Sequence, residues 1–447
     1  MTTNKGLFTT DDGKNVFVTF ALVSSLFLLW GFCNGMIDVM DRHFQVELHL
    51  SLGQSAWVQF AHYLGYFLMS LPAGWLAIKL GYKGGIIAGL LLVACGGFWF
   101  IPATHIGAFW AFLLGVCLIA SGLTFLETIA NPYTTVLGSK EFAVTRINLA
   151  QSCNSIGWFL GPIAGAMFFY SKDAAGKSTG AQTLWIPYAG VAVVVVVLAI
   201  VFYFAQVPDI QTQDEYHLDD ATPNVSHSIW THPHFVMAVA AQFFYVAAQA
   251  GIFSFFINYM TSQVPAIPAS WNVGWLAGYF EAKDGALHIS DKGASVLASV
   301  GFLCFLAGRF SGAYILKFRP AHKVLGWYAL LNVAICLLIF CKLGWISVAC
   351  VFLSYFFMSI MFPTIFALGI HGLGVRAKKA SGFIVMAIMG GAILPKIMGH
   401  VADMWDISRG FIVPLFCFAF VALYGFCWPK LSQSSGHENK PVHSVLH

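Results

Sequence analysis

The chain has 447 residues, of which 58% are hydrophobic and 9% are charged, and its formal net charge is +4. A soluble domain carries about 25% charged residues, so this chain cannot cover a water-facing surface. The composition therefore predicts a polytopic membrane protein, and the small positive charge gives no indication of a nucleic-acid partner.

Twelve apolar segments are long enough to cross about 30 Å of hydrocarbon, which takes roughly 17 to 25 helical residues. They must be helices, because a helix bonds its own backbone groups where no water is available. The sequence therefore predicts an all-α polytopic membrane protein. The predicted spans are 17–40, 56–79, 84–101, 107–130, 146–170, 184–206, 233–260, 290–316, 322–341, 345–370, 380–402 and 409–428.

A long acidic stretch, "VPDIQTQDEYHLDDATPNVSHSIWTHP", follows the sixth span. It predicts an N-terminal six-helix bundle over 1–206, a linker over 207–232, and a C-terminal six-helix bundle with a short tail over 233–447. Lysines and arginines gather in the loops on the side of the two termini, for example at Lys79, Lys83 and Lys379. The positive-inside rule then predicts that the linker and both termini are cytoplasmic.

Traces of an internal repeat support this division. The fourth span ends in "NPYTTVLG" and the tenth contains "FPTIFALG", so that Pro132 precedes Gly138 as Pro363 precedes Gly369. The fifth and eleventh spans contain "GWFLGP" and "GGAILP" in the same order. Transporters are often built from such repeats, with the substrate site at the midplane where Pro and Gly interrupt the helices.

Two carboxylates lie within apolar spans. Glu127 stands in "FLETIANPY", and the matching position of the second half is Met358, so neither packing nor symmetry requires an acid there. A charge at mid-bilayer costs about 2.5–3.5 kcal/mol on insertion scales. Asp38 stands in "WGFCNGMIDVMDRHFQ", where the charged residues that follow leave an interfacial position as the alternative. Burial disfavours the ionised form of a carboxylate, and we interpret the pair as a proton-coupling device.

Amide and aromatic side chains accompany these acids in the first, fifth and seventh spans. Such groups suit a neutral polyhydroxyl solute, whose hydroxyls both donate and accept hydrogen bonds. An anionic substrate would need buried Arg or Lys, and the half with the acids has none central to a span. Helix–helix hydrogen bonding is the alternative role of each amide. The candidate substrate-binding residues are Asn34, Glu127, Gln151, Asn154, Tyr245, Gln249 and Asn258.

Motifs along nearly the whole chain resemble the major facilitator superfamily and, within it, the fucose:proton symporter family of sugar permeases. They include "NGMIDVMDRHFQ", "GYFLMSLPAGWLAIKLGYKGGI", "FLETIANPYTTVLG", "RINLAQSCNSIG", "AQFFYVAAQ" and "SGFIVMAIMGGAILP". The resemblance implies twelve helices in two bundles, a bacterial inner membrane and a monomer. It also implies that Asp38 and Glu127 serve proton coupling, with Glu127 facing the sugar, and that the other candidates apart from Asn258 match or neighbour the cavity. His62 and Lys396 depart from the family pattern, which leaves the hexose open.

The resulting expectation is proton-coupled symport of a neutral monosaccharide, L-fucose or a related hexose, by alternating access. A sodium-coupled hexose symporter and a non-transporting sugar sensor are the alternatives. An enzyme is not expected, because the sequence has no nucleophile elbow, no H-E-x-x-H motif and no zinc-ligand spacing among its ten cysteines. No cofactor or metal is expected; the expected partners are a sugar, protons and the lipid bilayer.

Overall fold

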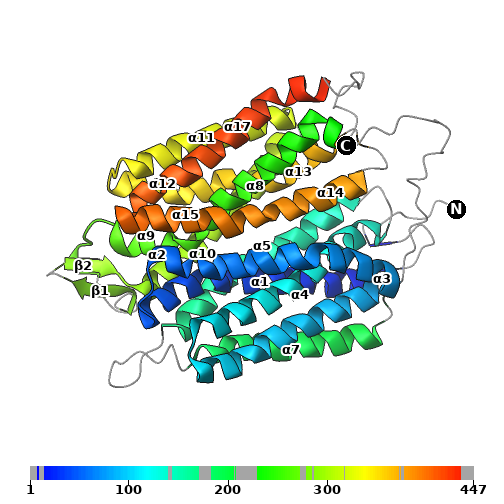
Figure 1. The fold of residues 1–447 in the computed structure, drawn as a ribbon, viewed down its shortest axis with the longest axis horizontal. Coiled ribbons are helices and arrows are strands. Elements are labelled where there is room, and N and C mark those ends of the chain that lie inside the picture. The colour runs from blue at the N-terminus through cyan, green and yellow to red at the C-terminus, as the bar shows by residue number, and fades with distance from the viewer. Residues whose placement is uncertain are drawn as a thin grey trace. The chain divides into compact units, whose positions relative to one another are not determined.

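A computed structural model describes residues 8–9, 15–138, 143–170, 183–205, 207, 229–271, 278–283, 286–316, 318–371, 373 and 377–433. The elements are almost all helices, which Figure 1 traces from the N-terminus to the C-terminus. Contacts between residues group the chain into two compact units. Unit 1 comprises Met1–Leu50, Trp57–Thr212 and Ser290–Ser299, and unit 2 comprises Ser51–Ala56, Gln213–Ile289 and Val300–His447.

Unit 1 contains long membrane-length helices. The second and third predicted spans run together, and the chain turns between them at Gly81, whose φ of 68° lies in the left-handed region. Glycine adopts this conformation without the penalty that a side chain brings. The helices are α1 (Phe17–Glu47), α3 (Trp57–Ile106), α4 (Phe109–Val136), α5 (Ala143–Phe168) and α7 (Trp185–Phe204).

Unit 2 holds the second half of the helices, several of them broken. The seventh, tenth and eleventh predicted spans each form two helices separated by a short irregular or 3-10 segment. The first turns of α10 belong to unit 1. The helices are α2 (Leu52–Ser55), α8 (Pro233–Ser254), α9 (Phe256–Ser262), α10 (Asp291–Leu316), α11 (Ala321–Phe340), α12 (Trp345–Met358), α13 (Met361–Ile370), α14 (Ala377–Met386), α15 (Gly390–Met404), α16 (Ile407–Gly410) and α17 (Ile412–Gln433).

A short antiparallel hairpin precedes α10 in unit 2, and the sequence did not predict it. Strands β1 (Phe280–Lys283) and β2 (Ala286–Ile289) pair with Phe280 opposite Ile289. Leu287 also bridges to Ile267. Two four-residue strands in a polar loop change nothing in the all-helical membrane architecture.

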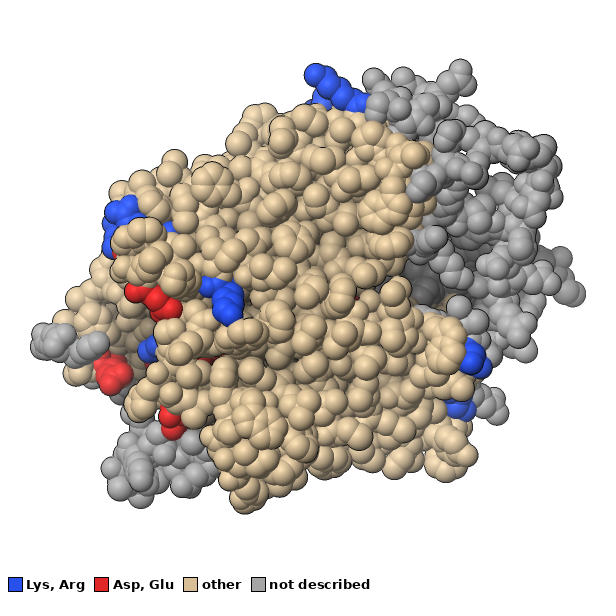
Figure 2. Space-filling model, viewed as in Figure 1, with Lys and Arg blue, Asp and Glu red and all other residues tan. Residues whose placement is uncertain are grey.

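The twelve-helix architecture is confirmed. Ten helices in the described residues are long and apolar enough to cross a membrane, and the two remaining predicted spans are the first part of α3 and α5. On the face drawn in Figure 2, the charged side chains lie mostly near helix ends, with uncharged surface between them. Most of the predicted linker, residues 208–228, lies outside the described residues, so the domain boundaries stay a prediction.

Glycines let the first and fifth helices of each half cross at backbone distance. A Cβ atom at Gly157 of α5 would meet the carbonyl oxygen of Leu28 on α1, and one at Gly31 of α1 would meet the carbonyl of Asn154. In unit 2, a Cβ at Gly390 of α15 would meet the carbonyl of Phe243 on α8. Gly157 and Gly390 open the repeated sequences "GWFLGP" and "GGAILP", so the repeat has the same packing role in both halves.

Candidate functional site

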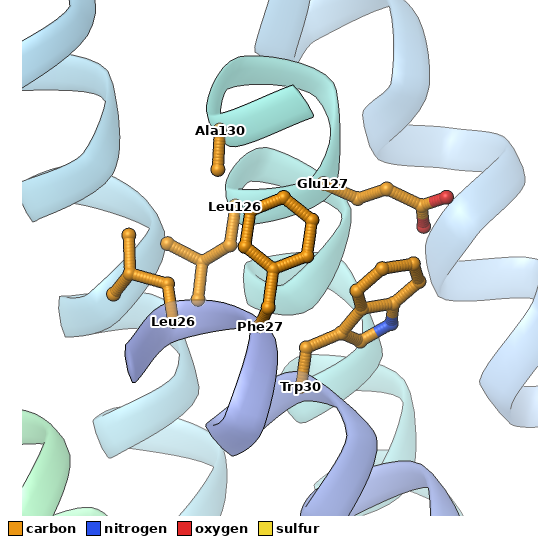
Figure 3. Close-up of a pocket in the computed structure, with 6 residues that line it drawn as sticks. All are labelled: Leu26, Phe27, Trp30, Leu126, Glu127 and Ala130. Carbon is orange, nitrogen blue, oxygen red and sulfur yellow. The ribbon is translucent and has the colours of Figure 1, made fainter. Parts of the chain in front are cut away.

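Glu127 lies on α4 beside a small recess within unit 1. About 160 Å³ lies between the atoms of the recess, including space open to the outside, and its lining is otherwise apolar: Leu26, Phe27, Trp30, Leu126 and Ala130. Figure 3 shows the Glu127 carboxylate and the indole nitrogen of Trp30 on the same side of this recess. Glu127 is half-buried, so a carboxylate and two aromatic rings meet a space that contains little other polar surface.

Tyr66 of α3 connects α1 to the surroundings of Glu127. The indole Nε1 of Trp30 donates to the Tyr66 hydroxyl oxygen at 2.7 Å, and the Asn34 side chain also forms a hydrogen bond with Tyr66. Glu127 interacts electrostatically with the same tyrosine. An indole N–H can only donate, so the Tyr66 oxygen accepts and its own proton remains to be donated. The side chain of Tyr66 on α3 therefore interacts with residues of both α1 and α4.

Asp38 lies further along α1 and is 9% exposed. The Nε2 atom of Gln59 on α3 donates to Asp38 Oδ1 at 2.9 Å, and Gln59 also lies 3.4 Å from Asp41 Oδ2. Asp38 Oδ2 is buried without a hydrogen-bond partner among the described residues. The side chain is therefore enclosed by protein in unit 1, which argues against the alternative of a solvent-exposed interfacial residue.

The two α5 candidates flank the glycine contact with α1. Asn154 is buried, and its Nδ2 donates to the backbone carbonyl of Phe27 at 3.2 Å. This bond joins α5 to α1 next to the recess, as expected of an amide in helix–helix contact. Gln151, one turn earlier, is half-buried, and its position on the same face keeps it a candidate for the substrate.

The remaining candidates belong to unit 2. Tyr245 is fully buried in α8, and its hydroxyl donates to the backbone carbonyl of Met358 at 3.0 Å. Gln249, one turn later, is half-buried. Asn258 is buried in α9, where its backbone carbonyl accepts hydrogen bonds from the hydroxyls of Thr261 and Ser262. The structure therefore places Asn34, Asp38, Glu127, Gln151 and Asn154 in unit 1 and these three residues in unit 2.

Sequence reasoning missed several polar residues of both units. In unit 1, Trp30 donates to Tyr66, and Gln59 donates to Asp38. In unit 2, the Arg309 guanidinium lies 4.8 Å from the centroid of the Phe305 ring and interacts electrostatically with Tyr245. Each of them is a polar residue inside an apolar span, but apart from Arg309 this does not distinguish them from residues that serve packing and helix contacts. In the part of the chain that the structure describes, no group of three or more His, Cys, Asp or Glu is placed to hold a metal ion.

Comparisons with known proteins agree with this architecture. The family model of the Major Facilitator Superfamily matches residues 16–282. The chain is 34% identical over 430 residues to a glucose/galactose transporter of Brucella abortus, covering 96% of this chain and 98% of that one. It is also 34% identical to the L-fucose-proton symporter of Escherichia coli over 431 residues, covering 92% and 93%.

Solved structures match over the same length. A crystal structure of the E. coli fucose:proton symporter, FucP, has a TM-score of 0.65 and 33% identity, covering 93% of this chain and 99% of that one. A bacterial homologue of the lysosomal transporter Spinster has a TM-score of 0.69 at 12% identity, which bears on the fold alone. The relatives are transporters, so the prediction of a membrane transporter and not an enzyme is confirmed. The chain belongs to the major facilitator superfamily and, within it, to the group that contains the fucose–proton symporters and glucose/galactose transporters.

Proposed function

We propose that this protein is a proton-coupled symporter of a neutral monosaccharide, L-fucose or a related hexose. The relatives are named for fucose, glucose and galactose, which share a ring of hydroxyl groups and carry no charge. The observation that carries the proposal is the position of Glu127, a membrane-helix carboxylate at a recess walled by Phe27 and Trp30. Binding sites of small molecules combine such apolar and aromatic walls with a few placed polar groups.

The acids supply the coupling in this proposal. Protonation of Glu127 or Asp38 removes a negative charge from a low-dielectric region, where an unpaired charge is costly. The loaded, neutral carrier can then change between outward-open and inward-open states without stranding that charge. The amides Asn34, Gln151 and Asn154 offer donors and acceptors for sugar hydroxyls.

The proposed membrane location, topology and oligomeric state are those predicted from the sequence. The proposed carrier is a monomer in a bacterial inner membrane, with bundles over 1–206 and 233–447 and a cytoplasmic linker over 207–232. Alternating access would be a movement of these bundles about the sugar. The Lys and Arg bias of the loops supports termini that face the cytoplasm.

Sodium coupling is the second candidate, and one observation favours it. Asp38 Oδ2 and Asn34 Oδ1 are buried oxygens without hydrogen-bond partners among the described residues, and they lie one turn apart on α1. Oxygen atoms are the ligands that hard cations prefer. A sodium ion could use these two oxygens in place of a proton on Asp38.

The first prediction tests coupling directly. Purified protein in proteoliposomes should accumulate labelled fucose, galactose or glucose under an inward proton gradient without sodium. Glu127→Gln should lose this uphill uptake, while sugar–sugar counterflow persists because no net proton movement is needed. Accumulation that requires sodium would contradict proton coupling and favour the second candidate. Sugar binding without flux under any gradient would contradict transport and favour a sensor.

A further inference from the structure

His62 of α3 is a buried titratable residue that the proposed function has not used. It is 5% exposed, and its Nδ1 atom has no hydrogen-bond partner among the described residues. Its ring packs against the rings of Tyr63 and Tyr66, each with centroids 5.0 Å away. An unsatisfied nitrogen in such a position costs free energy that an apolar residue would not, so a purely packing role explains it poorly.

The hydrogen bonds between α1 and α3 indicate which residues of α1 lie opposite His62. Asp38 is bridged to Gln59, and Asn34 and Trp30 are bridged to Tyr66. Residues three and four apart share a helix face, so Gln59, His62 and Tyr66 form one row on α3. Residue numbers rise along α3 from Gln59 to Tyr66 while they fall along α1 from Asp38 to Trp30, so the two helices run antiparallel here. His62 therefore lies between the two bridges, opposite the turn of α1 that carries Asn34 and Asp38.

The turn of α1 opposite His62 contains two more buried polar atoms of this kind. Asp38 Oδ2 and Asn34 Oδ1 are buried without hydrogen-bond partners in the described part of the chain, like His62 Nδ1. Asp38 is 9% exposed and Asn34 is 7% exposed. These three atoms belong to the stretch of α1 and α3 between the two hydrogen-bonded bridges in unit 1. They include a carboxylate oxygen and an imidazole nitrogen that are not hydrogen-bonded to each other, and such a pair can exchange a proton through one water molecule.

We propose that His62 is the intermediate proton carrier between Asp38 and Glu127. The Asp38 carboxylic acid passes its proton through one water molecule to His62 Nδ1 and becomes a carboxylate. The imidazolium releases a proton from Nε2 toward the recess, where the Glu127 carboxylate accepts it. Asp38 loses one proton and Glu127 gains one, while His62 returns to neutrality as the other tautomer. Tyr66 is hydrogen-bonded to Trp30 and Asn34, packs against His62 and interacts with Glu127, so it positions the His62 ring near the acceptor.

This inference rests on the proposed proton coupling and names the route within the same site. The rings of Tyr63 and Tyr66 pack against His62. Gln59, one turn before it, contacts Asp38 and Asp41, and Tyr66, one turn after it, interacts with Glu127. Histidine suits the task because its unperturbed titration lies closest to neutral pH among side chains. Glutamine fills a similar space and keeps hydrogen-bonding atoms but cannot carry the proton.

The test compares His62→Gln and His62→Phe with the wild-type protein in proteoliposomes. Each variant should lower proton-driven sugar uptake by about tenfold or more and flatten its dependence on pH. Sugar–sugar counterflow should stay within about twofold of wild type, since it needs no net proton transfer. Counterflow also shows that the variant is folded and binds sugar.

His43→Gln is the matched control. His43 is 2% exposed on α1, where its ring packs against Phe169 at 5.5 Å between centroids. It follows Asn34 by nine residues, about two and a half helical turns, and so lies on the opposite face of α1. Its substitution should leave the ratio of proton-driven uptake to counterflow unchanged.

The outcomes separate the carrier role from the proposed function. Wild-type uptake rates in both His62 variants would overturn the relay and leave the proton symporter standing. Equal losses of uptake and counterflow would show that His62 holds the sugar or the fold, which also overturns the relay. A wild-type protein without any response to the proton gradient would overturn the proposed function itself.

Discussion

At the scale of single residues, Tyr66 links the polar side chains of α1 to Glu127 on α4. Its hydroxyl accepts from Trp30 at 2.7 Å, bonds Asn34, and lies within electrostatic reach of Glu127. In a membrane interior, a buried polar group without a partner loses its hydrogen bonds to water and gains nothing in return. Tyr66 therefore provides the hydrogen-bond partner of Trp30 and Asn34 on α1 and holds these two side chains near Glu127.

Tyr66→Phe should destabilise the protein by about 1–3 kcal/mol, because the part-buried indole N–H of Trp30 and the buried amide of Asn34 lose this partner. Thermal unfolding in detergent measures the loss. Ser70→Ala on the same helix is the control, since the Ser70 hydroxyl donates to the carbonyl of Phe67 one turn earlier on its own helix and its loss should be small. Equal stability of Tyr66→Phe and wild type would show that water or another group replaces the phenol.

These residues also show where sequence reasoning ends. Asp38 and Glu127 could be singled out because charges are rare in apolar spans. Tyr66 and Gln59 could not, since tyrosines and amides also serve packing and helix contacts. Their importance comes from facing Trp30 and Asp38 across two helices. That pairing depends on the relative register of α1 and α3, which no local pattern contains.

At the scale of elements, the contact between α1 and α5 positions the amides. Gly157 lets the backbones approach so closely that a Cβ would lie 2.5 Å from the backbone nitrogen of Phe32. Asn154, one turn earlier on α5, then reaches the Phe27 carbonyl. Small residues at such crossings are typical of membrane helices, which associate by close packing and not by expulsion of water.

Gly157→Ala should force α5 away from α1 and destabilise the protein by about 1–3 kcal/mol, as overpacking does. Sugar binding should weaken with it, because Gln151 and Asn154 move with the helix. Unfolding midpoints and binding isotherms measure the two effects. Gly190→Ala on α7 is the control, because a Cβ there meets nothing within 4 Å. A stable Gly157→Ala variant with normal sugar binding would show that α1 and α5 can move apart without cost.

The helical spans themselves could be read from the sequence, while their breaks could not. Hydropathy predicted a helix at each of the twelve positions, since length and apolar composition decide membrane insertion. The breaks after Ser254 and Met358 and the strands β1 and β2 were not predicted. They depend on how neighbouring helices compensate the interrupted backbone hydrogen bonds, which is a property of the packed unit.

At the scale of the whole molecule, the proposal makes transport electrogenic. A neutral sugar that crosses with a proton carries one positive charge, so the membrane potential must drive uptake even without a pH difference. A charge that crosses 100 mV changes free energy by about 2.3 kcal/mol. Because each 1.4 kcal/mol is a tenfold change in an equilibrium ratio, one proton per sugar supports roughly 50-fold accumulation at that potential.

Potassium-loaded proteoliposomes with valinomycin, at equal pH inside and outside and in sodium-free buffer, should therefore concentrate the sugar. The final ratio reports stoichiometry, since two protons per sugar would square the value expected for one. Glu127→Gln vesicles should equilibrate the sugar without concentrating it, because that carrier returns without a proton. Wild-type accumulation that ignores the potential would rule out net charge movement with the sugar, and accumulation restored only by sodium would assign the transported charge to that ion.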